Sequence, residues 1–252
     1  MKKLFILSLC FFMLAGANPV FSIGEDVVKT GYVCRDMEGG KRWEAETEIR
    51  KKEGDVYILT EKGEGVYSSF EGPISWKAEM EFESTEENVT PLKLVKRVFD
   101  EDGNMIRLEK QDYDPVKKSV TCLHEDIPKK ISRTKKFKFT KDAVNRLLLG
   151  FYIQKMLEKG GRIAKIQMVS EEPGFYNIDL SVVKTEDVKI NGRKRRAYKL
   201  QLDPRLGLLD IVKVFFPKAY AWHSAEPKFE WLRYKGLEGD IRSAKVEVTT
   251  ED

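Results

Sequence analysis

Residues 140–161, TKDAVNRLLLGFYIQKMLEKGG, decide the fold because they break the period-two pattern of most of the chain. Thr140 can cap the start of a helix, Asp142 suits its positive first turn, and the two final glycines can end it. These signals predict one long helix over about residues 140–159. Its apolar residues spread around the whole helix, which is typical of a helix buried on most sides.

On both sides of this segment, apolar and polar residues alternate as they do in half-buried antiparallel strands. Clear cases are residues 77–83, 176–182, 198–202 and 244–248. The pair Asn191-Gly192 is a hairpin turn signal. We expect a mainly β fold of about ten or eleven strands. A strongly curved antiparallel sheet, or open half-barrel, that wraps the helix would bury it and leave the other face of the sheet in water.

The N-terminus, MKKLFILSLCFFMLAGANPVFS, has the order of a secretory signal peptide over residues 1–22: two lysines, an apolar run and small residues. Cleavage fits after Ala17 or after Ser22. The alternative is a retained anchor, but the apolar run is shorter than the ~18 residues that spanning needs. Cys10 lacks the small residue that precedes a lipidated cysteine. We therefore expect export to the periplasm through a cleaved signal.

The remaining residues, 23–252, suit a single β-rich domain. Without the signal the formal net charge falls from +4 to +2, because that segment holds two lysines and no acidic residue. So balanced a charge argues against a general polyanion binder, and no nucleic-acid partner is expected. No later stretch is apolar and long enough to cross a bilayer.

Two cysteines, Cys34 and Cys122, follow the signal. In an oxidising compartment they can pair, which would stabilise the fold by about 4 to 5 kcal/mol on the chain-entropy model. The distance between them cannot be read from the sequence, so two separate buried thiols are the open alternative.

Two segments near the C-terminus carry a resemblance. Residues 217–222, PKAYAW, fit Pro-Lys-x-Tyr-x-Trp, and residues 231–239, WLRYKGLEG, fit Trp-Leu-x-Tyr-x-Gly-Leu-Glu-Gly. The chain resembles an uncharacterised domain family of exported proteobacterial proteins that carries these two segments. That family is similar in architecture to the periplasmic lipoprotein carriers, whose half-barrels receive acyl chains. By analogy of fold alone, the resemblance implies a lipophilic ligand, and it brings no catalytic residues.

His223 and Ser224 are the sharpest candidates for catalysis, as a base beside a nucleophile. Adjacent residues of a strand point to opposite faces, so these side chains cannot easily bond each other. The stretch reads better as a strand, a turn marked by Pro227 and a return strand. Two isolated histidines, without C-x-x-C or H-E-x-x-H motifs, predict no metal site. We expect no catalytic residues, no cofactor and no enzyme activity.

A basic run follows the Asn-Gly turn: Arg193, Lys194, Arg195 and Arg196. At a hairpin tip it can contact an anionic surface such as lipid phosphates, or it can keep a sheet edge from pairing with other chains.

Aromatic residues gather in the last strands. Period two places Trp231 on one face of its strand and Tyr234 on the other. These side chains can line the open mouth of the curved sheet and meet a ligand or partner, or they can pack as core. The candidate contacts are Tyr220, Trp222, Trp231, Arg233 and Tyr234.

The sequence thus favours a periplasmic binding or carrier module for a lipophilic or cell-envelope ligand. The alternative is a structural or assembly protein that contacts another envelope protein, and a hydrolase is a distant third.

Overall fold

The computed structural model describes residues 27–170, 173–205, 217–239 and 243–251. The predicted signal peptide, residues 1–22, lies outside this part. The elements are, in chain order: β1 (Val27–Asp36), β2 (Lys41–Glu53), β3 (Val56–Val66), β4 (Pro73–Ser84), β5 (Val89–Phe99), β6 (Met105–Asp114), β7 (Ser119–Asp126), β8 (Ile131–Lys138), β9 (Asp142–Asn145), the 3-10 turn η1 (Arg146–Leu148), α1 (Leu149–Glu158), β10 (Ile163–Val169), β11 (Phe175–Ile190), β12 (Arg193–Arg205), β13 (Ala219–Ser224), β14 (Trp231–Leu237) and β15 (Lys245–Glu251).

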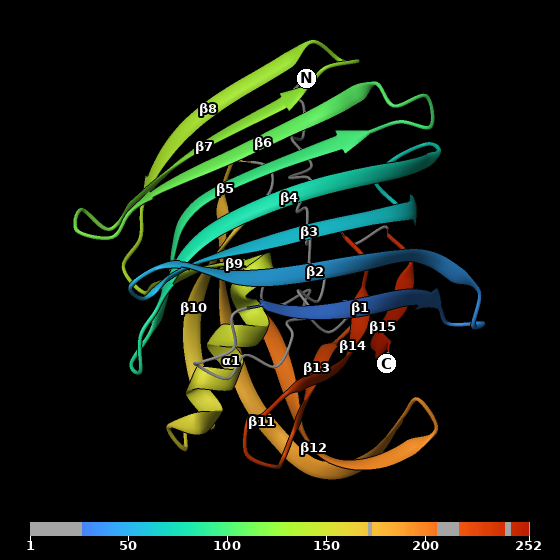
Figure 1. Cartoon of the computed structure of the whole chain (residues 1–252), viewed down its shortest axis with the longest axis vertical. Helices are drawn as coiled ribbons and strands as arrows, with labels where there is room; N and C mark the ends of the chain where they lie inside the picture. Colours follow the sequence, from blue (N-terminus) through green and yellow to red (C-terminus); the bar gives the residue numbers. More distant parts are fainter. Residues whose placement is uncertain (1–26, 171–172, 206–216, 240–242, 252) are drawn as a thin grey trace, which may run out of the picture.

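All fifteen strands form one sheet, in the order β8-β7-β6-β5-β4-β3-β2-β1-β15-β14-β13-β12-β11-β10-β9. Neighbouring strands of this sheet pair antiparallel except β9 and β10, which are parallel. The sheet curls around α1 without closing, so β8 and β9 are its two edges (Figure 1). The predicted fold, an open and strongly curved antiparallel sheet around a helix, is confirmed.

The predicted alternation places the main core on the concave side of the sheet. On β4, Ala78, Met80 and Phe82 are buried, while the glutamates between them lie on the other face. Leu180 on β11 and Val248 on β15 belong to the same apolar core. Side chains at i and i+2 of a strand share a face, so one alternating pattern encloses the interior from both halves of the sheet.

The helix is shorter than the predicted 140–159. Asp142–Asn145 is strand β9, which pairs with Ile166–Val169 of β10. Thr140 is not the cap: Asn145 caps the 3-10 turn η1 that precedes α1, and its side chain accepts the Leu147 N–H at 2.9 Å. The pairing with β10 explains the error, since a short apolar run reads equally well as strand or helix.

The C-terminal end of the helix is as predicted. Gly160 adopts a φ of 73°, and the N–H of Gly161 donates to the carbonyl of Met156 at 2.8 Å. This is the left-handed termination that glycine permits. Within the half-barrel, Phe151 of α1 packs on Phe82 of β4, with ring centroids 5.7 Å apart.

The hairpin of β11 and β12 folds back onto the outer face of the sheet. At its tip, Asn191 and Gly192 have φ angles of 47° and 79°, as the predicted type I′ turn requires. The Asn191 side chain donates to the carbonyl of Thr250 on β15 at 3.2 Å. Beneath the hairpin lies a second, small apolar cluster: Val188, Ile190, Ala197, Trp222 and Leu232.

Candidate functional site

His223 and Ser224 are the last two residues of strand β13, and the turn to β14 follows them, as expected. Both are buried. The Nδ1 of His223 lies 2.8 Å from the Phe229 carbonyl, and the Ser224 hydroxyl accepts the Glu226 N–H at 3.1 Å. Burial lowers the pKa of His223 to about 4. The two side chains therefore serve the β13–β14 connection and not each other.

The aromatic candidates divide between two faces, and one part of the prediction is wrong. Trp231 and Tyr234 both face the main core, because a bulge shifts the register of β13 and β14 between Trp222 and His223. A bulge adds one residue, so side chains three apart come to share a face. These two side chains fill the interior and do not line a mouth.

Tyr220, Trp222 and Arg233 lie on the outer face. The Arg233 guanidinium stacks 4.1 Å above the Trp222 ring, and Lys199 Nζ lies 3.9 Å from the centre of Tyr220. Trp222 also donates to Glu186 at 2.8 Å. Each ring is already covered by cations, which makes a structural role the simpler explanation.

The predicted basic run is largely neutralised. Lys194 and Arg196 pair with Asp187 at 2.9 and 3.3 Å, and Arg195 pairs with Glu230 at 2.7 Å. Three of the four cations therefore hold the folded-back hairpin, whereas Arg193 is exposed.

The two cysteines are free thiols in the structure. Cys34 and Cys122 are both buried, on β1 and β7, which five strands separate in the sheet. Burial raises the pKa of Cys122 to about 12 and also raises that of Cys34. The structure thus corresponds to the alternative of two separate buried thiols.

Neither a cluster of metal ligands nor a membrane-spanning helix is present among the described residues. No group of three or more His, Cys, Asp and Glu side chains there is arranged to hold a metal ion. Within the same ranges, no helix has the length and apolarity to cross a membrane.

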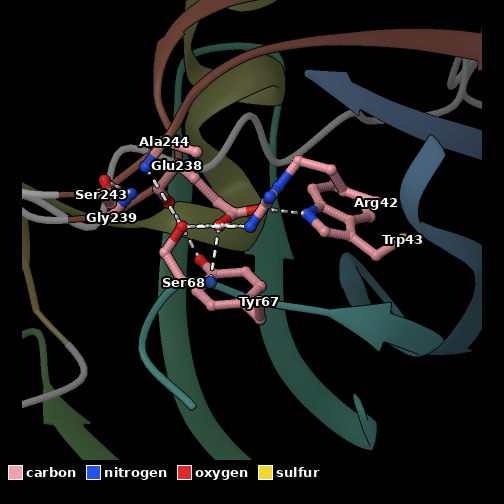
Figure 2. A network of polar contacts seen from close by, with 8 residues as sticks. All are labelled: Arg42, Trp43, Tyr67, Ser68, Glu238, Gly239, Ser243 and Ala244. Carbon is pink, nitrogen blue, oxygen red and sulfur yellow. Dashed lines mark hydrogen bonds and ion pairs between the residues drawn. The ribbon is translucent and has the colours of Figure 1, made fainter. Parts of the chain in front are cut away.

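A fully buried carboxylate, Glu238, follows β14 and collects donors from two other parts of the chain (Figure 2). Arg42 on β2 donates to both oxygens, each at 2.9 Å. The indole Nε1 of Trp43 donates to Oε1 at 3.0 Å. Ser68 donates to Oε2 from its backbone N–H at 2.7 Å and from its hydroxyl. The carboxylate accepts five hydrogen bonds in all, and its hydrogen bonding with Arg42 raises the pKa of that guanidinium.

The same network ties the β3–β4 loop, residues 67–72, to the β14–β15 connection. The Tyr67 hydroxyl donates to the Glu238 carbonyl at 3.0 Å. The Ala244 N–H donates to the Ser68 hydroxyl at 3.2 Å. The bonds to the Glu238 carboxylate, by contrast, are charge-assisted, and such bonds are about twice as strong as neutral ones. Glu238 is therefore a structural lock that holds the β3–β4 loop.

The locked loop bridges one end of the half-barrel. Six strands lie between β6 and β14 in the sheet. Even so, Ser68 bonds Glu238 just after β14, and Phe70 lies 4.5 Å below the Arg107 guanidinium of β6. Ser68 and Phe70, two residues apart in the loop, thus contact both walls of the half-barrel. Such contacts require the sheet to be curled.

A pocket of about 500 Å³ lies beside this bridge. Its walls come from the β3–β4 loop, the β5–β6 turn and the β7–β8 turn. The apolar part of its lining is Phe70, Pro73, Ile74, Ile106 and Pro128, and the charged part is Arg107, Asp126, Lys129, Glu71, Asp100, Glu101 and Asp102.

Arg107 is the unusual member of this lining. It is only 8% exposed, and within the described chain its Nε has no hydrogen-bond partner. Its terminal nitrogen lies 4.0 Å from Asp126, a carboxylate that Lys129 already holds at 2.8 Å. Burial opposes ionisation of Asp126, but the bonds from Lys129 outweigh it and lower the pKa of that carboxyl. Arg107 thus carries a buried charge whose hydrogen bonds are incomplete.

Arg107, which lines the pocket, also belongs to a polar band of the concave face. Arg107 lies opposite Val98 of the main core in the register of β5 and β6, so its side chain points inward. The other buried members of this band are Lys96 of β5, Glu109 and Gln111 of β6, and His124 of β7. Such a lining suits the recognition of a small amphiphile with an anionic group.

The sequence of β6 contains a pattern that indicates this polar interior, although Arg107 was not among the predicted site residues. Residues 105–114, MIRLEKQDYD, place Arg107, Glu109 and Gln111 at successive alternate positions. A strand that faces a core normally has apolar residues on one side, so polar residues on both sides mark an unusual interior. Glu238 belonged to a segment quoted for the family resemblance, but its role depends on residues 170 or more positions away.

No protein-family model and no curated protein matches the chain. Among solved structures, it is similar to a beta-barrel-like protein of a domain of unknown function (DUF1849) from Brucella abortus. The two share 7% sequence identity with a TM-score of 0.53, over 89% of this chain and 95% of the other. At this identity the likeness shows only that the two chains share a beta-barrel-like fold, and it carries no information about function.

Proposed function

We propose that the chain is an exported, periplasmic and non-catalytic binding or carrier module for an amphiphilic ligand of the cell envelope. Arg107 binds the anionic group of that ligand at the end of the half-barrel bridged by the β3–β4 loop. One observation carries the proposal: a guanidinium that is 8% exposed and incompletely bonded lines a pocket of about 500 Å³. The signal-like sequence of residues 1–22 supports export.

An anionic ligand would remove an energetic cost. A buried donor without a partner costs about 1–3 kcal/mol, and more when the group is charged. The planar guanidinium matches the two oxygens of a carboxylate or phosphate, and it binds them while stacked on an aromatic ring. Phe70 supplies that ring, 4.5 Å from the centre of the guanidinium.

The other pocket residues narrow the class of ligand. Phe70, Ile74 and Ile106 suit an apolar chain. Glu71, Glu101 and Asp102 add negative charge to the lining, which disfavours a ligand with a second anionic group. The ligand that fits has one anionic group, an apolar part, and an outer part that is neutral or cationic.

Binding of dodecyl phosphate by calorimetry, below its micellar concentration, tests the proposal. Arg107→Gln removes the charge but leaves Asp126 with its partner Lys129. We expect affinity to fall at least tenfold. Arg97→Gln is the matched control, because Arg97 is an exposed arginine of the neighbouring strand, and it should bind like the wild type.

Mass spectrometry of the natively purified protein completes the test. We expect a stoichiometric amphiphile in the wild type and its loss in Arg107→Gln. Equal binding of dodecyl phosphate by all three proteins would refute the role of Arg107. Failure of the wild type to bind it, together with no amphiphile in the native protein, would refute the carrier function.

A further inference from the structure

The two edges of the sheet are protected in different ways. Strand β9, Asp142–Asn145, is four residues long, and its last three residues are buried. Strand β8, Ile131–Lys138, is eight residues long and exposed at five successive positions, 132–136. It pairs with β7 through eight residue pairs without a register shift. Proteins usually blunt an edge with short strands, bulges, proline or a covering segment, and the described part of β8 has none of these.

Positive charge is the one protective feature that β8 has. Residues 127–141, IPKKISRTKKFKFTK, contain seven basic residues and no acidic residue. Lys129 pairs with Asp126. Within the described ranges, no carboxylate forms an ion pair with the other six, which are Lys130, Arg133, Lys135, Lys136, Lys138 and Lys141. This density of unneutralised charge distinguishes β8 from the basic run of β12, where three of four cations are paired.

The cations of β8 lie on both faces of the strand. In the register with β7, Arg133 lies opposite His124 and Lys135 opposite Cys122, so both point to the concave side. Lys136 and Lys138 alternate with them and point to the convex side. A membrane or other flat anionic surface would be expected to meet cations gathered on one face. An added strand presents side chains to both faces, directly opposite those of its neighbour.

We propose that the free edge of β8 binds an acidic, extended segment of another protein as an additional strand of the sheet. Main-chain hydrogen bonds along the edge would provide affinity, as in other cases of strand addition. Acidic residues at adjacent positions of the added strand, one directed to each face, would select the partner by pairing with the cations on both faces. The same cations repel a second copy of β8, so the edge favours an acidic partner over self-association.

Fluorescence anisotropy with the labelled ten-residue acidic peptide EEVVEEVVEE, which carries Glu on both faces of a strand, tests this inference. The variant carries Arg133→Gln, Lys135→Gln, Lys136→Gln and Lys138→Gln. We expect its affinity for the peptide to fall at least tenfold. The matched control neutralises the four cations of residues 193–196 instead, and we expect less than a twofold change.

A second peptide of the same sequence, N-methylated at alternate residues, separates strand addition from charge attraction. It keeps every carboxylate but loses main-chain donors, so we expect it to bind at least tenfold more weakly. Deuterium exchange should slow within residues 131–138 on binding of the unmodified peptide. Equal affinity for the two peptides would refute strand addition. Failure to bind the peptide, with binding of anionic phosphatidylglycerol vesicles that the β8 variant loses, would instead assign the edge to a membrane surface.

Discussion

Arg42 and Arg107 both lie beside a carboxylate, with side chains 18% and 9% exposed, but their bonding is opposite. Arg42 donates twice to Glu238, whose carboxylate accepts five hydrogen bonds (Figure 2). Arg107 lies 4.0 Å from Asp126, and its Nε has no partner within the described chain. The Glu238 carboxylate is fully bonded, whereas Arg107 lines a pocket and its hydrogen bonds are incomplete. Completeness of hydrogen bonding, more than burial, distinguishes a structural charge from one available for binding.

The largest effect is expected from Glu238→Ala. Removing one partner of a buried pair leaves the other charge uncompensated, which costs about 3–5 kcal/mol. Denaturant unfolding should show a loss of this size. Glu247→Ala is the control, because Glu247 forms only longer, partly exposed contacts with Arg233 and Lys235. Its loss should stay below about 1 kcal/mol. Similar losses in both variants would mean that the lock adds little.

His223 provides a third case, an incompletely bonded group without a pocket. Its Nε2 has no partner in the described chain, and its pKa is lowered from 6.5 to about 4 by burial. Between these two values the unfolded chain binds a proton that the folded chain does not, so stability falls as pH falls. The loss should approach roughly 3 kcal/mol by pH 4.

Unfolding curves of the wild type and of His223→Gln, between pH 7 and pH 4, measure this contribution. Glutamine does not titrate and can still donate to the Phe229 carbonyl. Between pH 7 and pH 4, the free energy of unfolding of the wild type should therefore fall, relative to that of His223→Gln, by most of the roughly 3 kcal/mol. Parallel pH profiles would show that His223 is not kept neutral in the folded state.

The smallest effect is expected from Arg107→Gln on stability. Asp126 keeps Lys129 as a partner through its side chain and its backbone N–H. The chief loss is the stacking on Phe70, worth about 0.5–1 kcal/mol at an exposed site and ~2 when desolvated. Denaturant unfolding without ligand should detect a loss no larger than this, because removal of the incompletely bonded charge offsets part of it. A loss as large as that of Glu238→Ala would remove the distinction between the two arginines.

Most of the fold was predictable because alternation is a local property. The pattern on β4 and β11 was enough to place their core faces. The start of the helix was not predictable, since Asp142–Asn145 becomes a strand only by pairing with β10. The prediction that Trp231 and Tyr234 lie on opposite faces was wrong because a bulge shifts the register of β14 against β13. Such a bulge depends on the partner strand and not on the residues themselves. The Arg107 pocket depends on a bridge between opposite walls, which no sequence spacing reveals.

The position of β1 beside β15 has a consequence for how the chain can be rearranged. These strands, first and last among the described elements, are hydrogen-bonded neighbours in the middle of the sheet, whereas β8 and β9, consecutive in the chain, form its opposite edges. A circular permutant that joins β15 to β1 through a short linker, and opens at residues 139–141, would begin with β9 and end with β8. Each strand would then pair with its nearest neighbours in the chain. Among the described strands, β1 and β15 are paired although they are far apart in the chain. In the permutant this pairing would become local, which should speed folding without altering the sheet.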